Sequence, residues 1–517
     1  MSHACTPPSR PANLSILDLF AGPGGLDVAA DVLGYHVTGI EFDKDACATR
    51  SKAGMDTFYG DVRRYRASFF PRAEVLTGGP PCQTFTVAGH GAGRKALDQV
   101  LEYIQTLHDA VSAQDARWED IFRTWRRISE DLRRKAVLAE GVKAKKRAVE
   151  KSRAVTRKRL REILRTHRNS PVEIKSILRA LEVPGPLVRK AVELDGLMAE
   201  FRTLSSEIDR FRAELEELGD ERTGLVLQPL WWVIERSRRP GSTPYRAVVL
   251  EQVPTVMPVW KEYARVLATL GYRTQRQLMY TEAFGVPQTR KRAVLMARLG
   301  ETDIPKVGET HERYRTRGPV TRESDDDGYL WGEADVESRG ERDRPKESWV
   351  SMDAALKKAR AIASELTTPI DIPDRPAFTV VSNYGTGGDP EARGRRDHDA
   401  PSATVTGKVS RNRLVHKGTD TDLPSHERFS FAEAGVLQTF PVAYPWHGSD
   451  QPQQIGNAVP PRLALYVLRQ VLEPDLTRDE ANARLEQAVE DLESWEPRET
   501  VVVREHGDWE GHPLTGR

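Results

Sequence analysis

A short apolar run, LSILDLF at residues 14–20, is followed at once by the glycine-rich turn AGPGG at 21–25. The run predicts a buried strand, and the glycines predict a tight turn into a helix over 26–33. The same patterns predict further strands at 35–40, 57–58, 74–77, 245–250 and 292–297, and an amphipathic helix at 260–270. Strands that alternate with helices indicate a parallel, doubly wound α/β sheet.

Residues 99–219 have a different character and separate the two halves of this pattern. They are rich in Ala, Leu, Glu, Lys and Arg, and Pro184 and Pro186 interrupt them. We therefore expect at least two long helices that pair as a coiled-coil-like hairpin. Residues 115–170 contain 19 Lys or Arg against 8 Asp or Glu. This basic arm favours contact with phosphates, whereas a solvated helical face is the alternative; a protein partner or a spacer role also stays open.

The rest of the chain is less regular. Residues 300–425 are polar, rich in Gly and Arg and weakly patterned, which suits a loop-heavy second domain. Order returns at 429–440 and 455–472, and 477–495 predicts an acidic helix before a polar tail. No apolar run approaches the roughly 20 residues of a membrane helix, and the N-terminus lacks the pattern of a secretory signal. The formal net charge of +1 neither favours nor excludes a nucleic-acid partner.

The three cysteines, Cys5, Cys47 and Cys82, are too few and too scattered for a disulfide framework or a zinc site. We therefore expect a reducing, cytoplasmic setting and no metal. Cys82 stands in the loop GGPPCQTFT at 78–86, whose glycines and prolines place it after a strand end, where open α/β sheets bind ligands. A structural cysteine would normally lie in an apolar helix or strand, so Cys82 is a candidate nucleophile. Cys5 and Cys47 are expected to be inert.

Glycines in the first turn indicate a ligand site. Gly22, Gly24 and Gly25 would let a ligand approach the backbone, and Glu41 follows Gly22 by 19 residues, at the end of the next predicted strand. An acid there suits ribose hydroxyls, although an ordinary tight turn explains the glycines equally well. Asp61 would accept from an adenine amino group, or else cap a helix or turn.

Five segments occur in one order: DLFAGPGG (18–25), GGPPCQTFT (78–86), LEQV (250–253), QTRKR (288–292) and QQIGNAVPPRLA (453–464). In this the chain resembles the DNA cytosine-5 methyltransferases, over roughly residues 14–98, 220–300 and 425–472. The resemblance implies a doubly wound, Rossmann-like, S-adenosylmethionine-dependent methyltransferase domain and a smaller target-recognition domain. The helical coiled-coil-like insertion expected from residues 99–219 is added to this family pattern. The expected division is catalytic domain 1–98 and 220–300, insertion 99–219, target recognition 301–425, returning segment 426–475, and acidic helix and tail 476–517.

The resemblance also implies the roles of site residues. Cys82 would add to carbon 6 of a flipped cytosine while Glu251 acts at nitrogen 3, and Arg292 with Arg290 would hold the base carbonyl and orient the glutamate. The methyl donor would be lined by Phe20, Gly22, Gly25, Glu41, Phe42, Asp61, Val62, Asn457 and Val459. Duplex DNA would be the partner of a monomer, with no metal. By themselves, Glu251 could be a surface acid and QTRKR a basic turn that binds phosphate non-specifically.

Three departures from the family pattern stand out. Thr86 replaces a serine, Gln252 replaces an asparagine, and the insertion lies in the loop that would close behind Cys82. Two segments, 374–380 and 399–407, both resemble the block that closes the target-recognition domain, so its limit stays open. No single sequence reveals which side chains read the DNA sequence.

Three functions remain open at this level. The first is DNA methylation in restriction-modification, phage protection or genome marking. The second keeps the chemistry with an RNA substrate, and the third is a catalytically silent DNA-binding or assembly protein. Cys82, Glu251, Arg290 and Arg292 are all present, which favours an active enzyme.

Overall fold

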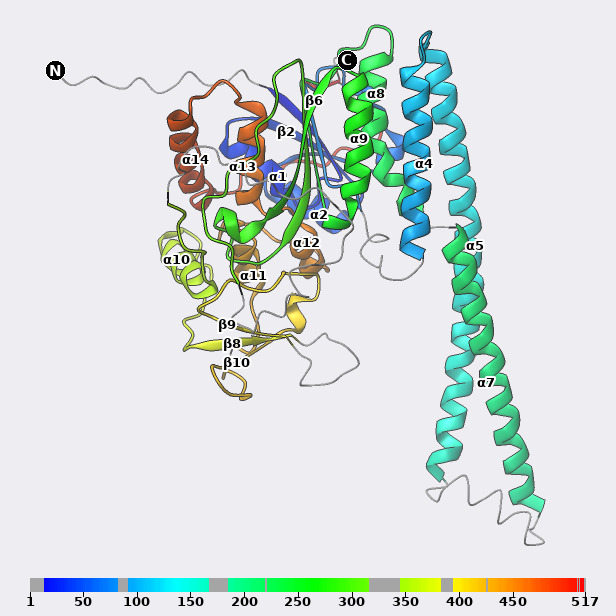
Figure 1. Cartoon of the computed structure of the whole chain (residues 1–517). Helices are drawn as coiled ribbons and strands as arrows, with labels where there is room; N and C mark the ends of the chain where they lie inside the picture. Colours follow the sequence, from blue (N-terminus) through cyan, green and yellow to red (C-terminus); the bar gives the residue numbers. More distant parts are fainter. Residues whose placement is uncertain are drawn as a thin grey trace, which may run out of the picture. The chain divides into compact units, whose positions relative to one another are not determined.

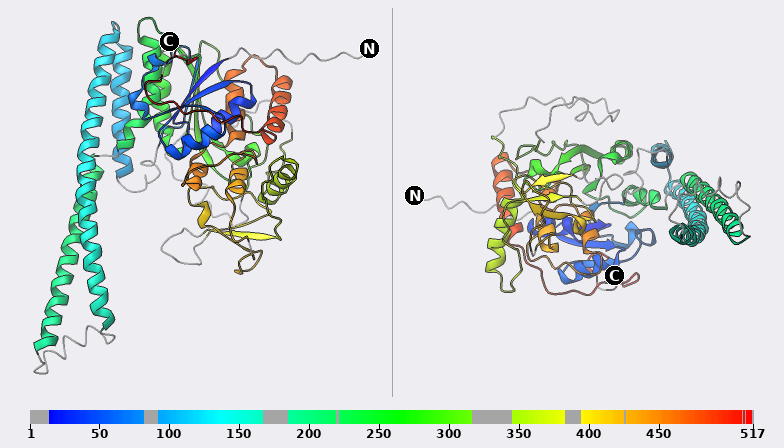
Figure 2. Two further views of the ribbon diagram at one scale, coloured as in Figure 1. Left: turned by 180° about the vertical axis from the view of Figure 1, so that it is seen from behind. Right: turned by 90° about the horizontal axis from the view of Figure 1, so that it is seen from below.

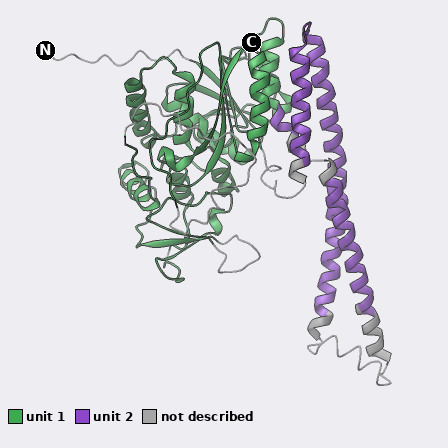
Figure 3. Cartoon of the chain, viewed as in Figure 1, with its two compact units in different colours: residues 1–81, 228–517 green, residues 82–227 purple. Residues whose placement is uncertain are grey.

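The computed structural model describes residues 14–81, 92–166, 185–218, 221–315, 345–382, 394–424, 426–508, 510 and 512–515. The chain forms two compact units, residues 1–81 with 228–517 and residues 82–227 (Figure 3). The first unit contains a seven-stranded and a three-stranded sheet. The second unit is helical.

The larger sheet has the strand order β3-β2-β1-β4-β5-β7-β6 (Figure 1). Its strands are β1 (Ser15–Leu19), β2 (His36–Glu41), β3 (Asp56–Tyr59), β4 (Val75–Gly78), β5 (Ala247–Gln252), β6 (Tyr272–Tyr280) and β7 (Lys291–Leu299). The six strands expected from the sequence are all present, with ends shifted by one or two residues. The chain therefore has the expected strand–helix alternation in its first half.

The expectation of a parallel sheet is right for five strands and wrong at β7. Strands β3, β2, β1, β4 and β5 pair in parallel, whereas β7 is antiparallel to both β5 and β6. The short connection 281–290 between β6 and β7 explains this, because a parallel crossover needs a dozen or more residues. Strand β6 itself was not expected, since its central residues 273–277 (RTQRQ) are all polar.

Both faces of the larger sheet are buried. Val249 and Val294 belong to the core that contains α1 (Gly25–Val32), α13 (Pro461–Leu472) and α14 (Arg478–Glu493). Their neighbours Val248 and Leu295 are equally buried and point to the opposite face. Figure 1 shows α13 and α14 on one side of the sheet and α8 (Gln228–Arg238) and α9 (Met257–Thr269) on the other. A doubly covered sheet is therefore observed.

The remaining elements of this unit are short. They are α2 (Lys44–Lys52), α10 (Met352–Glu365), α11 (Phe431–Leu437) and α12 (Gln451–Asn457), and the 3-10 turns η1 (Val62–Arg64), η2 (Ala67–Phe69), η4 (Pro254–Val256), η5 (Thr281–Phe284) and η7 (Val409–Arg411). The small antiparallel sheet has the order β10-β8-β9, formed by β10 (Arg413–His416), β8 (Phe378–Val381) and β9 (Arg395–Asp397). Its core joins residues of α10 to Leu437 and Ile455 of α11 and α12.

The helical unit contains α4 (Ala92–Ser112), α5 (Trp118–Thr166), α7 (Gly185–Leu218) and η3 (Glu221–Leu227). Helices α5 and α7 lie side by side in Figure 1 and in both views of Figure 2, which is the expected hairpin. Leu160 of α5 and Ile208 of α7 are among its buried apolar residues, and the Thr156 hydroxyl donates to Glu200 over 2.9 Å. Pro186 lies in the first turn of α7, and Pro184 is outside the described residues. Of the helices that the structure describes, none combines the length and apolar character of a membrane span.

A C-terminal strap, defined here as residues 498–508 and 512–515, covers the open edge of β3. The Arg504 N–H donates to the Thr57 carbonyl over 2.9 Å, and the Tyr59 N–H donates to the Arg504 carbonyl over 2.8 Å. Arg504 also forms an ion pair with Asp56, whose other oxygen lies 2.6 Å from His512 Nε2. The strap thus satisfies backbone groups that an edge strand would otherwise leave open.

Asp56 should make stability depend on pH. Burial acts to raise its pKa, but hydrogen bonds from His512 and Thr38 and the charge of Arg504 outweigh it and lower the pKa from 3.8 to about 2. A folded-state pKa below the unfolded value stabilises the fold above pH ~4, and this contribution is lost as the pH falls toward 2. We expect Asp56→Asn to cost roughly 2 kcal/mol at pH 7 and almost nothing near pH 2, measured by urea unfolding across pH. A cost that does not change with pH would contradict this linkage.

Candidate active site

The backbone conformation of the turn after β1 restricts which residues can stand there. Phe20, Gly22 and Gly24 all have positive φ angles, of 60°, 55° and 102°. Gly25 begins α1, and a Cβ there would lie 2.0 Å from the carbonyl oxygen of Val459. Only glycine therefore allows the start of α1 to pack against the segment that contains Asn457 and Val459.

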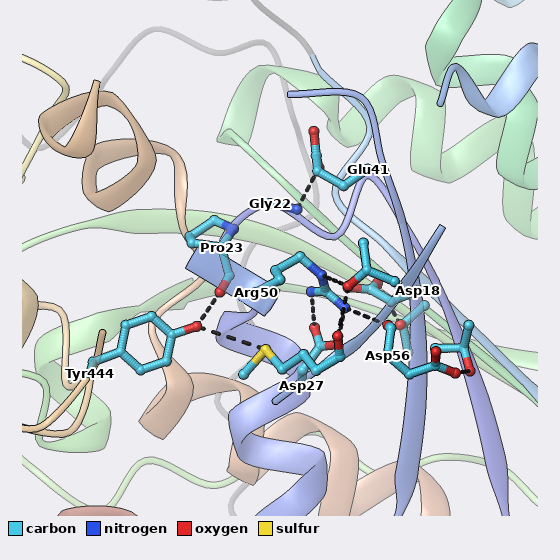
Figure 4. A network of polar contacts seen from close by, with 12 residues as sticks. Asp18, Gly22, Pro23, Asp27, Glu41, Arg50, Asp56 and Tyr444 are labelled. Atoms are coloured by element: carbon cyan, nitrogen blue, oxygen red, sulfur yellow. Dashed lines mark hydrogen bonds and ion pairs between the residues drawn. The ribbon is translucent and has the colours of Figure 1, made fainter. Parts of the chain in front are cut away.

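Glu41, at the end of β2, is held against this turn. Its carboxylate accepts the N–H of Gly22 over 2.6 Å (Figure 4). It also accepts the N–H of Phe42 over 2.8 Å and of Asp43 over 2.7 Å. Burial raises the pKa of Glu41, and the three backbone donors oppose that rise. Because a carboxylate offers about four lone-pair sites, one acceptor position is left for a ligand hydroxyl. The spacing of 19 residues thus corresponds to a direct contact.

The next turn follows β3. Asp61 caps η1 by accepting the Arg63 N–H over 2.9 Å, and its carboxylate pairs with the Arg63 guanidinium at 2.5 Å. Burial acts to raise the pKa of Asp61, but the contacts with Arg63 lower it overall. The cap that the sequence left open is therefore present. Nearby, Val62 is buried, and Phe42 is 67% exposed with its ring parallel to that of Tyr59, at 6.4 Å between centroids.

Buried charges lie beneath the first turn. Arg50, fully buried, donates to both carboxylate oxygens of Asp27 over 2.9 and 2.6 Å and to the Thr57 hydroxyl over 2.9 Å. Figure 4 shows Arg50 between Asp27, Asp18 and Asp56. Burial, and then the charge of Asp27, raise the pKa of Asp18 well above its ordinary value. These contacts link α1, α2 and the first three strands.

Asp18 also connects β1 to the loop that precedes Cys82. The Thr77 hydroxyl donates to its carboxyl over 2.6 Å, and Thr77 stands immediately before Gly78 and Gly79. Cys82 itself, like Thr86 and Cys5, lies outside the described residues. The structure describes this loop only as far as Pro81.

Glu251 and Arg292 meet at the ends of β5 and β7. The antiparallel register pairs Glu251 with Val294, and Arg292 Nε lies 2.5 Å from Glu251 Oε1. Both side chains are nearly buried, at 10% and 13% exposure. A Cβ on Gly79 would be 3.7 Å from Glu251 Oε2, so the carboxylate borders the loop toward Cys82. The structure thus brings these two candidates together.

Arg290 has other partners. Its guanidinium donates to the carbonyls of Val405 and Gly456 over 3.0 Å and of Ala458 over 3.3 Å. Burial and the neighbouring charge of Arg292 lower the pKa of Arg290, and Glu251 opposes that effect. Arg290 therefore binds three carbonyls of distant segments.

The segment 399–407 lies beside this turn, whereas 374–380 leads into β8. The Ser402 N–H donates to the Pro287 carbonyl over 2.9 Å, and the Thr289 N–H donates to the Ser402 carbonyl over 2.8 Å. Gln288, fully buried, accepts the Val405 N–H over 2.6 Å. Of the two segments that resemble the closing block, 399–407 is the one that contacts the turn 287–289.

Two contacts were not anticipated. The Gln252 amide donates to the carbonyl of Pro80, and its Oε1 accepts the Val253 N–H over 2.6 Å. Gln252 thus contacts the loop two residues before Cys82. The Asp27–Arg50 pair had no signal in the sequence, because Arg50 stands in a helix of mostly polar residues.

Burial raises the pKa of Cys47 to about 12, which agrees with an inert thiol. Within the described part of the chain, no cluster of three His, Cys, Asp or Glu side chains suits a metal ion.

Comparison with known proteins identifies a family. The family model described as C-5 cytosine-specific DNA methylase matches residues 14–111 and 246–473. The type II methyltransferase M.AplI of Arthrospira platensis is 36% identical over 78 residues, 15% of this chain and 23% of that protein. The type II methyltransferase M1.HphI of Haemophilus parahaemolyticus is 26% identical over 260 residues, 48% of this chain and 58% of that protein. This chain therefore spans less than two thirds of these relatives.

Similarity to solved structures is weaker. The S. pombe Dnmt2 methyltransferase is 12% identical, with a TM-score of 0.40 over 89% of this chain and 99% of that one.

Arg50 provides a test of the buried network. Arg50→Met would leave Asp27 buried without its partner, and we expect a loss of about 3–5 kcal/mol in urea unfolding. Arg246→Ala is the matched control, because its ion pair with Glu74 is longer, at 3.5 Å, and its side chain is 61% exposed. The control should cost less than about 1 kcal/mol. Equal losses of unfolding free energy in the two variants would show that the buried Arg50–Asp27 pair stabilises the fold no more than an exposed ion pair does.

Proposed function

Because this chain belongs to the C-5 cytosine-specific DNA methylase family, we propose that it transfers a methyl group from S-adenosylmethionine to carbon 5 of cytosine in duplex DNA. The observation that carries the proposal is the Glu251–Arg292 pair, nearly buried beside Gly79 in the loop that leads to Cys82. Relatives named type II methyltransferases support a role in restriction-modification or in protection of host or phage DNA. The protein would act as a monomer.

The residues of the first turn fit the methyl donor. Gly22 has open space beside its backbone for a ligand, and Gly25 lets α1 begin against the Val459 carbonyl. Glu41 keeps an acceptor for ribose, and the exposed ring of Phe42 offers a face to adenine. Asp61 and Val62 would complete the adenine side, and Phe20, Asn457 and Val459 the methionine side. When bound, S-adenosylmethionine supplies an electrophilic methyl group.

The chemistry then depends on side chains of this chain. Carbon 5 of cytosine is a poor nucleophile, and addition of the Cys82 thiolate to carbon 6 makes it reactive. Glu251 supplies the hydrogen bond or proton at nitrogen 3, and Arg292 orients Glu251 and binds the base carbonyl. After methylation, the carbon 5 proton leaves to a base and the Cys82–carbon 6 bond breaks. The target base must leave the helix to reach this site.

Arg290 enters the proposal as a positioning residue. Its hydrogen bonds to the carbonyls of Val405, Gly456 and Ala458 hold the turn 288–292 against two segments distant in sequence. Arg292 lies at the end of this turn, where β7 begins, so its distance from Glu251 depends on the position of the turn.

Methyl transfer from labelled S-adenosylmethionine to mixed-sequence duplex DNA tests the proposal. We expect label on carbon 5 of cytosine, none with Cys82→Ser, and at least a ~100-fold lower kcat with Glu251→Gln, because a general acid–base group of this kind contributes about that much. Cys47→Ser, at a buried thiol, is the control and should keep native activity.

Two outcomes favour the other functions. Greater transfer to RNA than to duplex DNA would favour an RNA methyltransferase. DNA binding with no transfer to either nucleic acid would favour the silent binding protein.

The same proposal assigns helix α5 a second contact with DNA. Arg147, Lys151, Lys158 and Arg161 are exposed and recur at intervals that place them on one helix face. Ion pairs described elsewhere on α5, such as Arg134–Asp131 and Lys143–Glu140, lie within the helix. None is described for these four residues or between α5 and α7. Their charge is thus available to phosphates and does not hold the hairpin together.

Salt dependence measures this contact. Neutralising Lys151 and Lys158 to Gln should lower the slope of log K against log salt by about 2 for random duplex DNA, since each phosphate contact contributes about 0.9. The control neutralises two exposed arginines of α7, Arg202 and Arg210. An equal reduction of the slope in the α5 variant and in the α7 control would indicate that only the net charge of the protein matters.

A further inference from the structure

The C-terminal strap contacts the turn that would hold adenine. It pairs with β3 at Thr57 and Tyr59 and then passes along Arg64 and Tyr65. Asp61 and Val62, assigned to the adenine side, lie between these two contacts in the chain. The inference below rests on that proposed cofactor site.

The first contact lies just before the turn. The strap's Arg504 exchanges two backbone hydrogen bonds with β3, of 2.9 and 2.8 Å, and its side chain pairs with Asp56. Tyr59, the last residue of β3, is one of the two partners. The end of β3 is thus held on its outer edge by the strap and on its inner edge by β2, where the Gly60 N–H donates to the Glu41 carbonyl over 2.8 Å.

The second contact lies just after the turn. His506 Nε2 is 3.0 Å from the Arg64 carbonyl, and its ring meets the edge of the Tyr65 ring with centroids 4.9 Å apart. Tyr65 is buried, and its hydroxyl donates to the Tyr59 carbonyl over 2.7 Å. A Cβ on Gly60, where φ is 150°, would lie 2.9 Å from that hydroxyl. The Tyr65 side chain therefore links the two ends of the turn 59–65, and the His506 ring packs against Tyr65.

The exposed ring of Phe42 packs against the same segment, residues 57–65. Phe42 stacks on Tyr59, whose backbone the strap holds. Phe42, Asp61 and Val62 therefore all take their positions from residues 57–65. We propose that Arg504 and His506 are positioning residues for the adenine side of the cofactor site.

A purely structural strap would behave differently. If the strap only covered the edge of β3, its loss would lower stability and leave the affinity of folded protein for ligand unchanged. His506 separates the two roles, because its side chain is exposed and its removal should cost little stability.

The experiment measures binding of two probes by calorimetry to the full chain. S-adenosylhomocysteine contains adenosine and an amino-acid half, whereas 5′-methylthioadenosine contains adenosine without the amino acid. We expect His506→Ala to weaken both by about the same factor, roughly fivefold, since its hydrogen bond to the Arg64 carbonyl and its contact with the Tyr65 ring are removed. His506→Gln, which keeps a donor, should recover part of the affinity.

Matched readouts complete the design. Val502→Ala changes another strap residue, 86% exposed, and should bind both probes as the native chain does. In the methyl-transfer assay, His506→Ala should raise KM for S-adenosylmethionine and leave kcat and DNA affinity unchanged.

The outcomes are distinguishable. Native affinity of His506→Ala for both probes, or a loss confined to S-adenosylhomocysteine, would overturn the positioning role while leaving the proposed function in place. Absence of S-adenosylhomocysteine binding by the native chain would overturn the proposed function and this inference with it.

Discussion

Arg290 donates to the carbonyls of Gly456 and Ala458, and one residue further the carbonyl of Val459 occupies the space where a side chain on Gly25 would stand. A single stretch of four residues therefore contacts both halves of the candidate site. Because it comes from the last part of the patterned sequence, the turn after β1 and the turn 288–292 are joined only when the chain has folded back on itself. A Cβ on Gly456 would meet the Gly407 nitrogen at 2.1 Å, so this stretch has no room for larger residues.

Buried carboxylates in this unit are stabilised in different ways. Asp27 is paired with a buried arginine, whereas burial and the charge of Asp27 raise the pKa of Asp18. Glu41 is surrounded by backbone N–H groups, and Glu251 by Arg292. The distinction follows from what each neighbour supplies, since a buried carboxylate needs a cation or donors to remain charged.

The helical unit interrupts the chain without interrupting the sheet. Strands β4 and β5 are direct neighbours, with Val75 opposite Ala247, although residues 82–227 stand between them in sequence. An insertion is tolerated in this way when it leaves and returns through a loop and brings its own core. Its buried residues, such as Leu160, Ile208 and Phe211, provide that core.

Local patterns in the sequence determined the six expected strands, the hairpin helices and the positions of Glu41, Glu251 and Arg292, because apolar periodicity and turn residues act over a few neighbours. Strand β6 was not predicted, because its central residues 273–277 are all polar and show no alternation of apolar and polar side chains. Tertiary structure decided what depends on distant contacts: the reversed direction of β7, the carbonyl partners of Arg290, the position of 399–407 beside the turn 288–292, and the strap on β3. The contact of Glu251 with Arg292 needed both. Each residue was recognisable in its motif, but only the antiparallel register of β5 and β7 brings the two side chains to 2.5 Å.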